Sequence, residues 1–213
     1  MSVEPGILAR GPWEPAAVKT AWRDDEYQPS DAQHAEADAA IAALHDRGSP
    51  SHDGLAARLA GFSEEDGLRM ELQPMRWSLR LGDDALGSIS VQCVVRDADG
   101  RWLAGRRAPW VATWAGRWAL GAGGAVEVGE DPVETLTREL HEEWGLTPER
   151  SQIEALVCTP NRLVLLVGSV WVASGAEITR DPEHDEHAWW PPDPGEWPAD
   201  ASPALGYMAR LLA

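Results

Sequence analysis

Three glutamates stand within five consecutive positions of the stretch GAVEVGEDPVETLTRELHEEWGL, which runs from Gly124 to Leu146. They are Glu139, Glu142 and Glu143. Like charges at i,i+4 destabilise a helix by roughly a few tenths of a kcal/mol per pair. A divalent cation offsets that repulsion directly, because hard cations take oxygen ligands. The cluster therefore indicates a metal site, with a solvated acidic face as the alternative.

The segment that carries the cluster has the start and stop signals of a helix. Asp131 is a suitable N-cap, Pro132 suits the first helical position, and Glu134 completes a capping box. Gly145 is placed to end the helix in a left-handed conformation. We therefore predict a helix over 131–145.

The apolar residues of this helix form one stripe that must face a core. At about 100° per residue, the three glutamates fall beside that stripe rather than opposite it. Arg138 stands four residues before Glu142 and can brace the cluster, and Glu130 can meet Arg138. A glycine-rich loop leads into the helix and allows the backbone to approach a ligand closely. The stripe consists of Val133, Leu136, Leu140 and Trp144.

These residues together resemble the Nudix box. The resemblance implies a Nudix-like α/β/α sandwich with a mixed sheet, in the α/β (α+β) class, over residues 87–213. It also implies a metal-dependent hydrolase that cleaves a diphosphate linkage in a nucleoside diphosphate derivative of the nucleotide sugar, ADP-ribose or NTP type. The pattern reads Gly124, five residues, Glu130, seven residues, Arg138-Glu139-Leu140, one residue, Glu142-Glu143, one residue, Gly145-Leu146.

Residue by residue, the resemblance makes Glu139, Glu142 and Glu143 the ligands of Mg²⁺ or Mn²⁺ and members of the catalytic set. Arg138 joins this set by orienting Glu139 through a salt bridge. The resemblance assigns structural roles to Gly124, Glu130 and Gly145.

The resemblance leaves the general base open. A box glutamate is one candidate, and Glu183, Asp185 and Glu186 in the stretch PEHDEHAWW are others, although a solvated loop is the simpler interpretation. Glu186 is also a candidate for substrate binding. We expect His184 and His187 in the same stretch to be surface groups rather than ligands.

Further candidates for substrate binding lie just before the box. Arg106 and Arg107 end a predicted strand and are placed to contact phosphate, and Trp110 or Trp114 can stack on a base. Large aromatic side chains more often fill a core or an interface. We expect that role for Trp118.

Two alternatives from other classes remain. The first is a non-catalytic Nudix-fold regulator that binds a nucleotide, although such proteins usually lose box carboxylates. The second is an enzyme like isopentenyl diphosphate isomerase, which Ala122 before two glycines resembles. Those isomerases need a cysteine in the entering segment, and residues 118–124 contain none. The complete box favours hydrolysis.

The composition limits the partners. The chain has 213 residues and a net charge of −17, which argues against binding nucleic acid or an anionic membrane. A phosphorylated small molecule remains possible when a cation mediates the contact. Cys93 and Cys158 lie in apolar runs and are expected to be buried, reduced thiols. Without a signal peptide or an apolar run long enough to span a bilayer, we expect a cytoplasmic protein. A homodimer is a further expectation.

Residues 1–86 lie outside the resemblance and are expected to form an N-terminal extension or a small α+β domain with helix and strand elements. We predict an irregular arm over 1–29, a helix over 30–48 with Ser30 as N-cap, and a short helix over 52–61. Two strands are expected on either side of Pro74, and a boundary within 81–87.

Over 87–213 the pattern predicts strands, a helix, more strands and a closing helix, which fits a mixed sandwich. The expected elements are a hairpin over 88–108, a strand in 116–120, the box helix, strands in 153–158, 162–173 and 186–191, and a helix over 201–212.

Overall fold

The computed structural model describes residues 4–212. Within them the strands are β1 Gly6–Trp13, β2 Val18–Trp22, β3 Leu55–Ser63, β4 Leu68–Arg76, β5 Ile89–Asp97, β6 Trp102–Arg107, β7 Trp118–Leu120, β8 Arg150–Cys158, β9 Val164–Val172 and β10 His184–Trp190. The α-helices are α1 Asp31–Asp46, α2 Pro132–Trp144 and α3 Pro203–Leu211, and the 3₁₀ turns are η1 Pro15–Ala17, η2 Trp77–Leu81 and η3 Pro194–Glu196.

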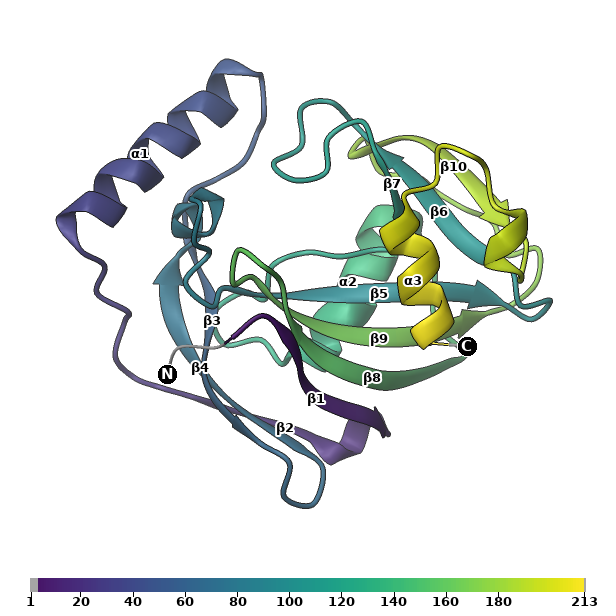
Figure 1. Cartoon of the computed structure of the whole chain (residues 1–213), viewed down its shortest axis with the longest axis horizontal. Helices are drawn as coiled ribbons and strands as arrows, with labels where there is room; N and C mark the ends of the chain where they lie inside the picture. Colours follow the sequence, from purple (N-terminus) through teal and green to yellow (C-terminus); the bar gives the residue numbers. More distant parts are fainter. Residues whose placement is uncertain (1–3, 213) are drawn as a thin grey trace.

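The larger sheet is mixed and has the strand order β1-β8-β9-β5-β6-β10, with β7 paired to β6. β5 and β9 run parallel, and the other pairs are antiparallel. Side chains of β5 alternate between two cores: Cys93 and Val95 pack with α2, whereas Val94 packs with α3. The sheet therefore lies between α2 and α3 (Figure 1), and the expected α/β/α arrangement is confirmed.

A smaller sheet of order β2-β4-β3 extends the core on the α2 side. Leu59, Leu68 and Leu72 from this sheet belong to the same buried cluster as Leu136 and Leu140 of α2. The N-terminal region therefore shares a hydrophobic core with the box helix. No helix among the described residues is long and apolar enough to cross a membrane.

The irregular arm expected over 1–29 is wrong for most of its length. β1 pairs with β8, in a register that places Gly6 opposite Cys158, and β2 runs parallel to β4. The partners of both strands are distant in the sequence, so no local period revealed them. The boundary between 1–86 and 87–213 stays a prediction, and β1 crosses it by joining the larger sheet.

Two further predictions in the N-terminal region are wrong. The short helix expected over 52–61 is the strand β3, because a short apolar run does not distinguish helix from strand and pairing with β4 decides. Pro74 does not separate two strands but lies inside β4, opposite Ala57. β2 ends opposite Leu72, so Pro74 stands beyond its edge, where a missing N–H is tolerated. Residues 77–81, expected as a strand, form η2.

Several predicted elements are confirmed. Ser30 caps α1 in a capping box with Gln33. In α2, Asp131 Oδ1 accepts a hydrogen bond from the Val133 N–H at 2.8 Å. The capping box expected with Glu134 is not formed among the described residues of this helix. Gly145 ends α2 with φ +66°, as expected. The expected hairpin, the later strands and the closing helix correspond to β5 to β10 and α3.

Candidate active site

The helix α2 places two carboxylates at the edge of its buried face. Leu136, Leu140 and Trp144 are at most 2% exposed and anchor the helix in the core. Glu139 and Glu143, one turn apart beside this stripe, are 9% and 5% exposed. Such burial of charged groups is costly without partners. The sequence-based placement of these two glutamates beside the apolar stripe therefore agrees with the structure.

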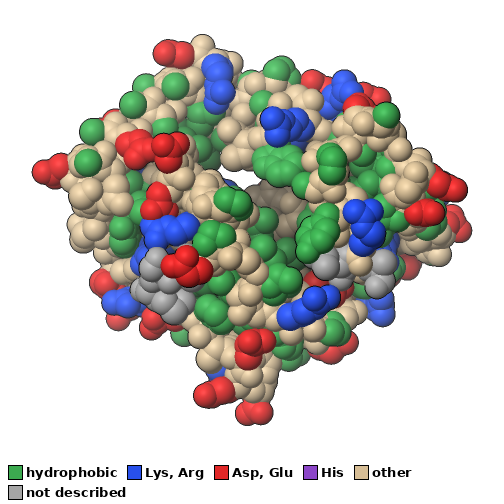
Figure 2. All heavy atoms as spheres, in the orientation of Figure 1, with side chains coloured by type: hydrophobic (Ala, Val, Ile, Leu, Met, Phe, Trp, Pro, Cys, Tyr) green, Lys and Arg blue, Asp and Glu red, His purple; other side chains and the backbone are tan. Residues whose placement is uncertain are grey.

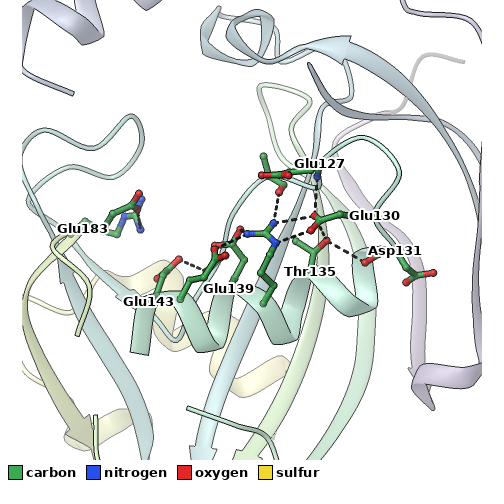
Figure 3. A network of polar contacts seen from close by, with 12 residues as sticks. Glu127, Glu130, Asp131, Thr135, Glu139, Glu143 and Glu183 are labelled. Carbon is green, nitrogen blue, oxygen red and sulfur yellow. Dashed lines mark hydrogen bonds and ion pairs between the residues drawn. The ribbon is translucent and has the colours of Figure 1, made fainter. Parts of the chain in front are cut away.

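Arg138 holds the carboxylates around it together, and Figure 3 shows Glu130 and Glu139 in this network of polar contacts. Its Nη1 lies 2.9 Å from Glu139 Oε1 and 2.8 Å from Oε2 of the exposed Glu142. Its Nε donates to Glu130 Oε1 at 2.8 Å, and its Nη2 donates to Glu130 Oε2 at 3.0 Å. Burial opposes ionisation of Glu130, but the hydrogen bonds from Arg138, the Glu127 N–H and Thr135 together outweigh it and hold the pKa of Glu130 below the usual range. Glu130 is thus the charged brace for Arg138.

The two buried glutamates resist ionisation without a counter-charge. Burial raises the pKa of Glu139 to about 7, although Arg138 acts in the opposite direction. Burial likewise raises the pKa of Glu143 to about 8, against the pull of Arg107. The charge of Glu183 adds to both increases. A bound cation would supply the missing positive charge.

Glu143 carries an oxygen suited to a ligand that the protein itself does not provide. Its Oε1 accepts from the Gly123 N–H at 3.0 Å. Its Oε2 is buried and has no hydrogen-bond partner among the described residues. Buried polar atoms in proteins nearly always have a partner. The unpartnered oxygen, with a second buried carboxylate one turn away, fits a hard divalent cation.

The carboxylates are not arranged as a finished metal-binding group. Among residues 4–212, no three His, Cys, Asp or Glu side chains already converge around one point. Glu139 and Glu142 are both drawn to Nη1 of Arg138 instead. Coordination would therefore require these two side chains to turn away from Arg138.

Gly124 leaves the space that the Glu139 carboxylate occupies. A Cβ atom at position 124 would overlap the carboxylate atoms of Glu139. The glycine in the box is thus explained by the close approach of a side chain to the backbone.

Gly124→Ala is expected to displace the Glu139 carboxylate, because this flexible end moves more easily than the backbone. The free energy of unfolding should change by less than about 1 kcal/mol, whereas Mg²⁺ affinity should fall about 10-fold or more. Titration calorimetry and urea unfolding measure the two quantities. Gly61→Ala, where an added Cβ meets ordinary contacts, is the control. Unchanged Mg²⁺ affinity in Gly124→Ala would contradict this role.

The candidates on β6, on β10 and just before β10 divide between two groups. Arg107 Nη1 lies 3.3 Å from Glu183 Oε2, and the charges of both residues act on Glu143. Figure 3 shows Glu183 across from Glu143. Arg106 instead lies 3.1 Å from Asp200 and 3.8 Å from Glu186. The structure therefore brings Arg107 and Glu183 to the α2 glutamates.

Arg106 and Glu186 belong to the other side of the sheet. The guanidinium of Arg106 lies 5.3 Å from the ring centroid of Trp118. Trp118 is buried in the cluster that packs against α3, as expected from its sequence position. Arg106 and Glu186 are thus near each other but are not brought to the α2 glutamates.

The loop over 108–117 carries the two tryptophans considered for base stacking. Trp114 is 48% exposed with φ +58°, and Trp110 is partly buried. Figure 2 shows a deep hollow in this face of the molecule, below the loop that joins β6 to β7 in Figure 1. A stacking role for either tryptophan stays a prediction.

His184 differs from its expected surface position. It is 1% exposed, its ring lies 4.4 Å from that of Trp144, and its Nε2 lies 3.6 Å from Glu143 Oε2. Burial lowers its pKa to about 3, so the ring is neutral. A register shift in β10 between His184 and Glu186 places His184 on the α2 side of the sheet, although Glu186 lies on the other side. His187 is exposed as expected.

Arg80 of η2 is a charged residue that sequence reasoning missed. Its Nη2 donates to Ser90 Oγ on β5 at 2.7 Å, and Glu139 is the carboxylate whose charge acts on it. No pattern marked it, because η2 was expected as a strand and lies outside the box.

A model of the NUDIX domain family matches residues 88–211. Comparison with curated proteins gives no match. Among solved structures, the chain is similar to the MutT protein from Methanosarcina mazei Go1, at 25% identity and a TM-score of 0.45, over 58% of this chain and 88% of that chain. It is also similar to the NUDIX domain of Shewanella oneidensis NrtR complexed with ADP ribose, at 16% identity and a TM-score of 0.48, over 59% of this chain and 85% of that chain. A third similar structure is that of a C. elegans Ap4A hydrolase, at 17% identity and a TM-score of 0.47, over 58% of this chain and 94% of that chain.

Proposed function

The chain belongs to the NUDIX domain family, whose model covers more than half of its length, and from this premise we propose that it hydrolyses a diphosphate linkage in a nucleoside diphosphate derivative with Mg²⁺ or Mn²⁺. The observation that carries the proposal is the pair of buried carboxylates on α2. Glu139 and Glu143 lie one turn apart beside the core, and Glu143 Oε2 has no partner among the described residues.

Each box residue has a role in this proposal. Glu139, Glu142 and Glu143 would hold the cation, and Arg138 would release the first two as they turn toward it. When bound, the cation would neutralise phosphate charge and lower the pKa of water. Gly123 fixes Glu143 through its N–H, so the free Oε2 keeps its direction. Glu130 keeps Arg138 in place whether or not Glu142 stays paired.

Glu183 is the general base that we propose. Its carboxylate would take a proton from the attacking water, whose oxygen then bonds to a phosphorus while the anhydride oxygen leaves with the other phosphate. Glu183 is favoured over Asp185, which is exposed, and over Glu186, which pairs with Arg106. The ion pair with Arg107 fixes its direction.

Glu183→Gln is expected to lower kcat about 10²-fold and to leave KM within a factor of about three, because the amide cannot accept the proton. Steady-state kinetics with excess Mg²⁺ measures both constants. Glu177→Gln, an exposed change in the segment before β10, should match the original protein. An unchanged kcat would remove Glu183 from the mechanism.

A substrate panel tests the proposal itself. The panel contains nucleotide sugars, nucleoside triphosphates, ADP-ribose and Ap4A, the last two being named for two of the similar structures. Each compound is incubated with Mg²⁺ or Mn²⁺, and phosphate-containing products are separated by chromatography. Tight binding without turnover would instead support a nucleotide-binding regulator. Isomerisation finds no support near the box, because Cys93 is fully buried and its burial raises the thiol pKa.

The homodimer stays part of this proposal as an expectation. Light scattering of the full chain at several concentrations would measure the mass directly. The full chain is required, because β1 pairs with β8 and the smaller sheet shares a core with α2.

A further inference from the structure

Arg80 is held in a fixed position by the N-terminal region. It belongs to η2, which lies outside the residues matched by the family model. Asp53 ties down the start of η2: its Oδ1 accepts from the Ser78 N–H at 3.0 Å, and its Oδ2 accepts from Arg76 Nε at 2.9 Å. Leu79 is buried against α1. The backbone that carries Arg80 is therefore anchored on both sides.

The side chain of Arg80 extends toward the box. Its Nη2 donates to Ser90 Oγ at 2.7 Å, and Ser90 pairs with Ala125 across a β-bridge. Ala125 follows Gly124, the residue that touches the Glu139 carboxylate. Glu139 is the carboxylate whose charge acts on Arg80, so the guanidinium and the α2 glutamates lie near each other.

Arg80 has a charge that its own surroundings leave unpaired. It forms no ion pair with any carboxylate in the part of the chain that the structure describes. A guanidinium offers five N–H donors, and Arg80 gives one hydrogen bond to a side chain. Burial lowers its pKa to about 10, and the charge of Glu139 opposes that shift. A partly buried cation in this condition is stabilised by an anion.

We propose that Arg80, supplied by the N-terminal region rather than by the family domain, binds a phosphate of the substrate's diphosphate group and so sets substrate affinity. This inference rests on the proposed function, because the phosphate is that of the same substrate. The cation at α2 and Arg80 would contact the phosphates from two sides. The N-terminal region thereby completes the active site.

A purely structural role makes a different prediction. If Arg80 only joined η2 to β5, its contribution would come from the hydrogen bond to Ser90. Ser90→Ala removes that bond and keeps the charge, whereas Arg80→Gln removes the charge. The two variants therefore separate phosphate binding from simple attachment of η2.

The test uses the full chain and two measurements. In kinetics with a hydrolysed panel compound, Arg80→Gln should raise KM about 10- to 100-fold and change kcat less than about three-fold. In calorimetry with inorganic pyrophosphate and Mg²⁺, the Kd of Arg80→Gln for pyrophosphate should rise by a similar factor. The KM and Kd of Arg80→Lys should lie between those of the original protein and those of Arg80→Gln, because lysine keeps the charge but loses the planar donor geometry. Ser90→Ala should stay within about three-fold of the original protein.

The outcomes distinguish this inference from the proposed function. Unchanged KM and pyrophosphate Kd in Arg80→Gln, or equal losses in Ser90→Ala and Arg80→Gln, would overturn the role of Arg80. If Arg80→Gln does not fold, Arg80→Lys and Ser90→Ala decide by the same comparison. If no panel compound is hydrolysed by the original protein, the proposed function fails, and pyrophosphate calorimetry still decides whether Arg80 binds phosphate.

Discussion

Glu143→Gln is expected to lower metal-dependent hydrolysis about 10³-fold or more and, at the same time, to stabilise the metal-free protein at pH 8. The amide keeps an oxygen for the Gly123 N–H but loses the charge that would hold a cation. The carboxylate is 5% exposed with a pKa raised to about 8 by burial, so ionising it destabilises the metal-free fold. We expect an increase of about 1–3 kcal/mol in the free energy of unfolding.

The opposite signs make this prediction specific. Hydrolysis is measured with the best compound of the panel, and urea unfolding is measured at pH 8 with EDTA. Glu134→Gln is the matched control, because Glu134 is exposed on the same helix. Glu134→Gln should change neither quantity appreciably. If Glu143→Gln keeps hydrolysis, or loses both hydrolysis and stability, then Glu143 is a structural residue rather than a cation ligand.

The sequence was most informative where the chemistry is local. Asp131, Pro132 and Gly145 bound the box helix, and a 3.6-residue period places Glu139 and Glu143 beside the buried stripe. All of these signals lie within one helical segment. Such contacts depend on spacing along the chain, so one sequence suffices to predict them.

The N-terminal region could not be predicted in the same way. β1 and β2 depend on partners that are distant in the sequence, and their own residues show no clear period. His184 comes near Glu143, and the charge of Glu139 acts on Arg80, only through the packing of β10 and η2. Neither residue has a neighbour in the sequence that suggests this chemistry. The roles of the box residues remain predictions, and so does the function of the N-terminal region.

The stability of the metal-free protein is expected to fall as pH rises from 6.5 to 8. The pKa values of Glu139 and Glu143 are raised to about 7 and about 8, above their ordinary value of 4.5. The folded state therefore binds more protons than the unfolded state in this window, and the free energy of unfolding decreases with pH. The decrease should be on the order of 2 kcal/mol.

The lower limit of this pH range is set by His184, whose effect on stability has the opposite dependence on pH. The pKa of His184 is lowered from 6.5 to about 3, so the unfolded state binds its proton more readily below pH 6.5. Taken alone, that contribution makes stability rise with pH up to about 6.5, and it offsets part of the effect of the two glutamates there. The pKa of Glu130 is lowered, so its contribution falls at still lower pH. Above pH 6.5 the effect of Glu139 and Glu143 is no longer opposed by His184.

Urea unfolding at half-unit steps from pH 6.5 to 8 measures this dependence with EDTA and with Mg²⁺. A cation that binds the ionised carboxylates stabilises the folded state by mass action, and it competes with protons for the same oxygens. The stabilisation by Mg²⁺ should therefore be larger at pH 8 than at pH 6.5, and Glu143→Gln should remove most of both effects. Glu134→Gln should behave as the original protein does. Two results would contradict this account: a metal-free stability that is constant or rises over this pH range, or an equal stabilisation by Mg²⁺ at pH 6.5 and pH 8. Either would show that burial does not keep the α2 carboxylates protonated in the metal-free protein.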